Sequence, residues 1–167
     1  MLLYEIVDAF NKEKLKYLIV GGYALALHGI VRATVDIDFV LHLKLKDFQL
    51  AESLLNKLGL QSRLPIRAQD VIKMRQEYIS NRNLLAWSFV DYKNPSRQID
   101  ILINKDINDL KCEQITVSGR KINVVDLKSL LKMKKESKRS QDKVDCESIQ
   151  AKINVMAKKK RQTNGKK

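Results

Sequence analysis

Residues 18–41 read LIVGGYALALHGIVRATVDIDFVL, and this stretch decides the fold. A short apolar run ends in the pair Gly21-Gly22, and a second apolar run holds Asp36 and Asp38. On a strand, residues two positions apart point to the same face, so both carboxylates project together. Two carboxylates side by side in an apolar segment repel each other unless a cation lies between them. The stretch therefore predicts a strand that presents two acidic side chains to one site.

Apolar periodicity in the rest of the chain predicts helices and strands that do not alternate regularly. This pattern is typical of an α/β or α+β domain, in which helices flank a short mixed sheet. Pro95 in the segment KNPS predicts a turn between two strands. The predicted helices cover 1–14, 22–29, 45–59, 68–80, 126–139 and 142–157. The predicted strands cover 16–22, 35–43, 84–92 and 97–103, with a hairpin over 114–126.

The length of 167 residues suits a single domain with one core. We expect this domain to cover residues 1–157, with C-terminal helices at about 126–157, and residues 158–167 to form a basic, disordered tail. No apolar run approaches the roughly 20 residues that cross a bilayer. The acidic N-terminal segment differs from a secretory signal, and two cysteines without a motif fit reduced thiols. The sequence thus predicts a cytoplasmic protein without a membrane partner.

The net charge of +13 is concentrated near the C-terminus. Residues 132–167 hold thirteen Lys or Arg against four acids, so this segment carries +9 of the total. Such asymmetry predicts a polyanionic partner, with nucleic acid favoured over an anionic membrane. For the final basic residues, a solvated tail is an equally good interpretation.

A third acid lies in the apolar segment 97–103, where Asp100 and the three isoleucines point to opposite faces. If this strand pairs beside 35–43, Asp100 joins the first two carboxylates; Asp91 is a rival for the same place. Three acids can hold two metal ions about 4 Å apart, the arrangement used for in-line phosphoryl chemistry. Carboxylate oxygens favour Mg²⁺, with Mn²⁺ as a second choice.

The glycine pair is the remaining part of the predicted site. Gly21 and Gly22 follow a strand and open a helix, and helix N-termini with exposed amides bind phosphate. Glycine lets a phosphate approach the backbone closely. A tight strand–helix turn without a ligand explains the same pair, so the glycines gain meaning only beside the acids.

Together these segments resemble the nucleotidyltransferase superfamily related to DNA polymerase beta, and most of all its AbiEii-type branch from bacterial toxin–antitoxin systems. The segment 130–145, LLKMKKESKRSQDKVD, resembles a motif on the C-terminal helix pair of that branch. The front motif consists of Gly21-Gly22-Tyr23-Ala24-Leu25, Arg32, Thr34 and Asp36-Ile37-Asp38, and the later motif of Lys134, Arg139, Asp142 and Asp145.

The resemblance implies a short mixed sheet with the active site at its edge, and transfer of a nucleotidyl group from a nucleoside triphosphate such as ATP, with release of pyrophosphate. It implies two metal ions on Asp36, Asp38 and Asp100, and a triphosphate near Lys134. The other implied roles are phosphate binding for Gly21, Gly22, Arg32 and Arg139, and orientation of Lys134 or of the acceptor for Asp142 and Asp145. Ordinary ion pairs with Lys138 and Arg139 are an alternative for the last two acids.

Three functions remain open from the sequence. The basic surface favours an RNA acceptor, with tRNA as the first choice and a toxin with a cognate antitoxin protein as its setting. A nucleotidyltransferase for a small molecule is the second, although +13 repels a cationic substrate such as an aminoglycoside. The third is a catalytically silent binding module, such as the antitoxin of a pair, which would not need three acids in apolar strands.

Overall fold

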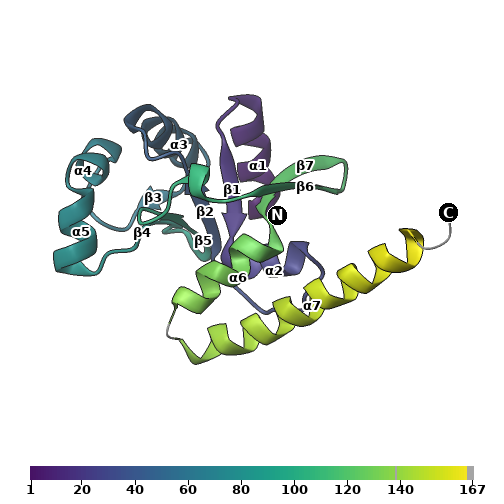
Figure 1. Ribbon diagram of the computed structural model, residues 1–167. Helices are drawn as coiled ribbons and strands as arrows, with labels where there is room; N and C mark the ends of the chain where they lie inside the picture. The colour runs from purple at the N-terminus through teal and green to yellow at the C-terminus, as the bar shows by residue number, and fades with distance from the viewer. Residues whose placement is uncertain (138, 165–167) are drawn as a thin grey trace.

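A computed structural model describes residues 1–137 and 139–164. Within these ranges a seven-stranded mixed sheet has the order β3-β4-β5-β2-β1-β7-β6 (Figure 1). The predicted class, a short mixed sheet flanked by helices with a helical C-terminal region, is confirmed. The strands are β1 (Tyr17–Val20), β2 (Ile37–Leu41), β3 (Gln61–Ser62), β4 (Ala86–Asp91), β5 (Asn94–Leu102), β6 (Cys112–Val117) and β7 (Arg120–Val125).

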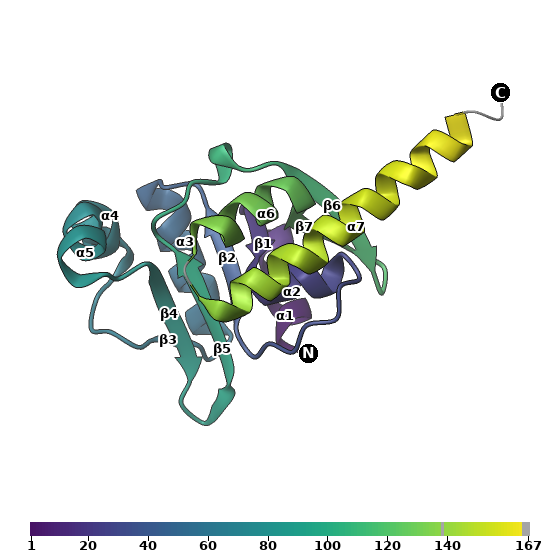
Figure 2. The same cartoon turned by 60° about the horizontal axis from the view of Figure 1, so that its bottom comes forward.

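Helices cover both faces of this sheet. Figure 2 shows α6 and α7 in front of the sheet, with α1 and α3 behind it. None of the helices in the described ranges is both long enough and apolar enough to cross a membrane. The helices are α1 (Leu2–Lys12), α2 (Gly21–Leu27), α3 (Leu45–Lys57), α4 (Ala68–Lys73), α5 (Arg75–Arg82), α6 (Leu127–Glu136) and α7 (Ser140–Asn164), with a 3₁₀ turn at Ile107–Asp109.

Aromatic side chains form the core on the α1 and α3 side. The Phe10 ring of α1 lies 5.6 Å from the Tyr17 ring and 5.5 Å from the Phe39 ring, centroid to centroid. Phe48 of α3 stacks on Trp87 of β4, and all five rings are buried. Because side chains alternate along a strand, the neighbour of Phe39 on β2, Asp38, points to the opposite face of the sheet. Asp100 on β5 is paired with Asp38 and points to the same face.

The central strands bring two distant acids together. Strand β2 pairs antiparallel with β1 and parallel with β5. In this register Asp38 lies opposite Val20 on one side and Asp100 on the other. The pairing of β2 with β5, on which the third-acid prediction depended, is therefore present.

Two local expectations were wrong. The turn expected at 93–96 lies at residues 92–93, because the Asp91 carboxylate accepts backbone hydrogen bonds from Lys93 and Asn94 at 2.9 and 3.3 Å. Pro95 then falls where the ladder to β4 is irregular, which is where a strand tolerates proline. The helix expected over 68–80 is divided into α4 and α5 at Met74.

The C-terminal helices also differ from expectation. Helix α6 ends earlier than the expected residue 139, and α7 begins at Ser140 and continues to Asn164. Residues 158–164, expected as a disordered tail, are thus helical; no Gly or Pro interrupts the chain between 140 and 164. The last part of that tail, residues 165–167, lies outside the described residues.

Candidate nucleotide site

A cleft of about 330 Å³ lies on the sheet face that carries Asp38, beneath α6 and the start of α7. One wall comes from the β1–α2 junction and the segment before β2, the floor from β2 and β5, and the other wall from α6 and α7. Nine of the ten residues predicted for the site line it: Gly21, Gly22, Arg32, Asp36, Asp38, Asp100, Lys134, Arg139 and Asp142. The tenth, Asp145, does not line the cleft but forms an ion pair with Lys134.

Three carboxylates converge on the floor of the cleft. Asp38 and Asp100 are direct neighbours across β2 and β5, and Asp36 stands one residue before β2. Burial, together with the negative charges of Asp100 and Asp36, raises the pKa of Asp38 to about 7, against the opposing effect of Lys134. The Oδ1 atom of Asp36 is buried and has no hydrogen-bond partner among the residues that the structure describes. The floor is thus a place where negative charge is destabilised until a cation arrives.

The donor set fits a metal ion that is held partly by its substrate. In the described ranges, no group of three or more His, Cys, Asp or Glu side chains is arranged so that it could hold a metal ion by itself. Mg²⁺ commonly binds through one or two carboxylates and fills its other positions with water and substrate phosphates. The unpartnered oxygen of Asp36 and the mutual repulsion of Asp36, Asp38 and Asp100 suit such a partial site.

The glycine pair is required first by packing. Gly21 has a φ of +65°, and a Cβ atom there would lie 1.8 Å from Oδ2 of Asp38. At Gly22 a Cβ atom would lie 2.6 Å from the Thr34 side chain. Any larger residue at position 21 would therefore displace the Asp38 carboxylate, so the glycine sets the position of that acid.

Lys134 projects from α6 between two acids of α7. Its Nζ lies 2.6 Å from Oδ1 of Asp142 and 2.8 Å from Oδ2 of Asp145. Both acids are nearly fully buried, and they stand three residues apart on one face of α7. Burial alone would lower the pKa of Lys134, but its hydrogen bonds to the two acids raise the pKa above the ordinary value. The ammonium group is thus held charged at the cleft wall.

One of these two acids, Asp145, also pairs with Arg32. The Nε of Arg32 lies 3.3 Å from Oδ1 of Asp145, so this aspartate bridges Arg32 and Lys134. Burial opposes ionisation of Asp142, but its bonds to Lys134 and Ser137 lower its pKa. Of the two alternative partners considered for these acids, Arg139 acts on Asp142 through its charge, and Lys138 lies outside the described residues.

The rival third acid, Asp91, lies elsewhere. It caps the β4–β5 turn, and its Oδ2 is 3.3 Å from Nε of Arg97. It does not line the cleft.

Sequence reasoning missed the apolar part of the cleft. Leu102, Leu130 and Met133 line it together with the acids. Leu102 stands two residues after Asp100 on the same strand face, and Leu130 stands four residues before Lys134 on the same helix face. Those two spacings could have indicated from the sequence that Leu102 and Leu130 share faces with the site residues. That the two faces enclose one cleft depends on how α6 crosses the sheet, which the sequence does not indicate.

Solved structures of the same architecture are nucleotidyltransferases. ANT(2″)-Ia in complex with adenylyl-2″-tobramycin superimposes with a TM-score of 0.60 and 14% identity, over 97% of this chain and 91% of that one. The lincosamide antibiotic adenylyltransferase LnuA, with lincomycin bound, gives 0.60 and 16% over 89% and 94%. An antigenic nucleotidyltransferase-like protein from Paracoccidioides brasiliensis gives 0.55 and 13% over 89% and 72%.

Sequence comparison adds nothing to this likeness. No protein-family model matches the chain. Among curated proteins, no sequence matches it either. The structural likeness extends over nearly the whole chain, including the helices that carry Lys134 and Asp142. The chain therefore has the nucleotidyltransferase fold.

Proposed function

We propose that this protein is a metal-dependent nucleotidyltransferase that transfers a nucleotidyl group from a nucleoside triphosphate to an RNA acceptor. The observation that carries the proposal is the meeting of Asp36, Asp38, Asp100 and Lys134 in one cleft. A cleft with three acids on its floor and a charged lysine on its wall suits a ligand that brings both cations and phosphates. A metal–nucleoside triphosphate complex is such a ligand.

In this proposal the three aspartates hold the cations, two Mg²⁺ ions or in their place Mn²⁺. When bound, these ions neutralise charge on the phosphates and orient the attacking and leaving oxygens. Lys134 neutralises the triphosphate as a point charge, and Arg139 and Arg32 are further phosphate contacts. The backbone of Gly21 and Gly22 forms the wall beside Asp38, where phosphate oxygens would approach.

The transfer breaks a phosphoanhydride bond of the triphosphate and forms a phosphoester bond to the acceptor. The acceptor hydroxyl oxygen attacks the α-phosphorus, and the bond from this phosphorus to the oxygen that bridges the α- and β-phosphates breaks. Pyrophosphate leaves with the electron pair of that bond. The proton of the attacking hydroxyl passes to a carboxylate, for which we propose Asp100 because it lies at the cleft floor beside Asp38. Asp142 and Asp145 act as positioning residues, since they hold Lys134.

The choice of RNA, with tRNA first, depends on charge. The net charge of +13 favours a polyanionic acceptor and opposes a cationic one. A small-molecule acceptor is the second candidate, because the ANT(2″)-Ia structure holds adenylyl-2″-tobramycin and the LnuA structure holds lincomycin. A place in the AbiEii-type branch, as a cytoplasmic toxin with a cognate antitoxin protein, stays a prediction from the sequence motifs. So does its opposite, a silent module that serves as antitoxin.

A transfer assay tests the proposal. The protein is incubated with Mg²⁺, total tRNA and each of the four α-labelled nucleoside triphosphates, beside an Asp36→Asn/Asp38→Asn variant. We expect label in RNA, and free pyrophosphate, with the wild type alone. Pyrophosphate release with an aminoglycoside and not with RNA would select the small-molecule function. Absence of transfer and of triphosphate binding would favour the silent module.

A further inference from the structure

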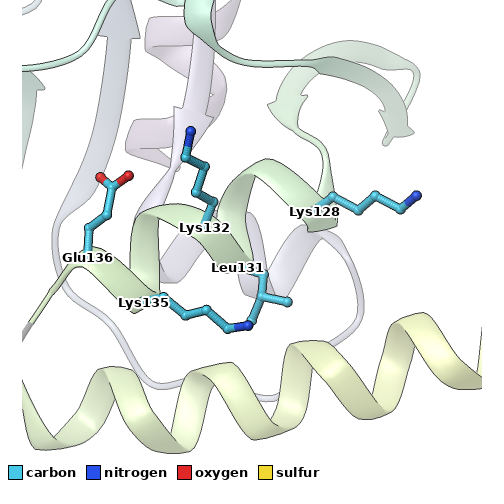
Figure 3. A pocket seen from close by; sticks show the side chains of 5 residues that line it. All are labelled: Lys128, Leu131, Lys132, Lys135 and Glu136. Atoms are coloured by element: carbon cyan, nitrogen blue, oxygen red, sulfur yellow. The ribbon is translucent and has the colours of Figure 1, made fainter.

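Helix α6 presents different residues on its two sides. Leu130, Met133 and Lys134 point into the cleft. The opposite side carries Lys128, Lys132 and Lys135, which we call the α6 lysine row. Figure 3 shows the three side chains leaving α6 in different directions, Lys128 to the right and Lys132 upward in this view, with the end of Lys135 beside Leu131. The residues follow one another at intervals of four and three, so they occupy one helix face.

The positive charge of the row is only partly compensated. All three lysines are exposed, and within the described ranges none of them lies within ion-pair distance of an acid, although the charge of Lys132 acts on Glu136. The acid of this face, Glu136, is engaged, since its Oε2 lies 2.5 Å from Nζ of Lys105. Three neighbouring cations with one shared acid still carry a net positive charge, and this arrangement is stabilised when an anion binds across them.

The row leads toward the nucleotide site. Lys135 stands seven positions after Lys128, so the row extends about 10 Å along α6 at 1.5 Å per residue. Lys135 stands only two residues before Ser137, which lines the cleft. A shallow depression of about 430 Å³ beside Leu131 runs along the same three lysines. A linear polyanion that follows the row from Lys128 therefore reaches the wall of the cleft.

We propose that the α6 lysine row binds the phosphate backbone of the RNA acceptor and guides the strand toward the cleft. This inference rests on the proposed function. The match between a linear array of cations and a linear polyanion favours RNA. An anionic membrane is disfavoured, because a membrane-binding helix inserts its apolar face, and the apolar residues Leu127 and Leu130 of α6 are buried in the protein core.

The test removes the row without touching the cleft. The Lys128→Gln/Lys132→Gln/Lys135→Gln variant is compared with the wild type for binding of labelled tRNA over a series of salt concentrations. A matched control removes the same charge from α3 and α4. It is the Lys46→Gln/Lys57→Gln/Lys73→Gln variant, all three of whose lysines are exposed and away from α6. Binding of a non-hydrolysable nucleoside triphosphate with Mg²⁺ is measured in parallel.

We expect the row variant to bind tRNA at least about tenfold more weakly, with a salt dependence reduced by about two to three units in the logarithmic plot, since each lost phosphate contact removes nearly one. The control should change far less, and both variants should bind the triphosphate like the wild type. Equal losses in row and control variants would overturn the proposal. So would row-dependent binding to vesicles of anionic lipid without binding to RNA. If the wild type itself does not bind the triphosphate, the proposed function is refuted, whatever the result with RNA.

Discussion

Replacement of Asp38 by Asn should stabilise the metal-free protein at neutral pH and abolish its response to metal. In the folded state, burial and the neighbouring charges of Asp100 and Asp36 raise the pKa of Asp38 to about 7. In an unfolded chain this carboxyl group titrates near its ordinary value of about 4. The folded protein therefore holds a proton that the unfolded chain has already released. Asn is close to Asp in shape and carries no charge, so it removes this conflict.

The magnitude follows from the shift. Below pH 4 the carboxyl group is protonated in both states, and it costs no stability. As pH rises from 4 to 7, the unfolded chain gains from ionisation and the folded protein does not, so stability falls through this window. A shift of about three pKa units corresponds to about 4 kcal/mol at 1.36 kcal/mol per unit. We expect about 2–4 kcal/mol of this destabilisation to be present at pH 8.

Denaturant unfolding in the presence of a chelator checks this at pH 4.5 and pH 8. The stability difference between Asp38→Asn and the wild type should grow by about 2–4 kcal/mol between the two pH values. Asp109→Asn is the matched control, because this acid is exposed and its stability difference should stay constant. If the difference for Asp38 is as constant as that for Asp109, the carboxylates do not repel one another in the cleft, and the argument for a cation fails.

Three further changes test other parts of the site. Gly21→Ala should destabilise the fold by about 1–2 kcal/mol, because alanine is strained at positive φ, and should weaken Mg²⁺–triphosphate binding by displacing Asp38; normal binding measured by calorimetry would contradict this. Asp142→Ala should cost about 2 kcal/mol in denaturant unfolding, less than a fully broken buried pair, because Lys134 keeps Asp145; an unchanged midpoint would argue against the ion pair. A non-hydrolysable triphosphate at 100 times its dissociation constant should stabilise the wild type by about 2.7 kcal/mol with Mg²⁺ present, and chelation should remove this thermal shift.

The sequence predicted those parts of the molecule that depend on local pattern. Alternation along 35–43 and 97–103 placed Asp38 and Asp100 on defined faces of two strands. Helical spacing predicted α1 and α3 nearly to their ends. The pairing of β2 with β5 could only be a condition of the argument, because strand order is set by long-range packing and not by the pattern of either strand.

Other features could not be predicted because they arise from contacts between distant elements. The glycine pair suggested a phosphate loop, whereas Gly21 is first required by its approach to Asp38. Propensity alone gave no reason for α7 to begin at Ser140, but the position of the helix lets Asp142 and Asp145 close on Lys134. The spacing of Lys128, Lys132 and Lys135 within the predicted helix 126–139 already placed them on one helix face, but only the packing of α6 shows that this face lies opposite the cleft.

Calorimetric titration of a non-hydrolysable nucleoside triphosphate tests the central claim most directly, with and without Mg²⁺, on the wild type, Asp38→Asn and Asp109→Asn. The account predicts one binding site in the wild type and Asp109→Asn that requires Mg²⁺, and binding at least about a hundredfold weaker in Asp38→Asn, because one of the ligands that orders the ion is lost. Binding that is equally tight without Mg²⁺, or equally tight in Asp38→Asn, would contradict the claim that these carboxylates hold a metal–triphosphate complex.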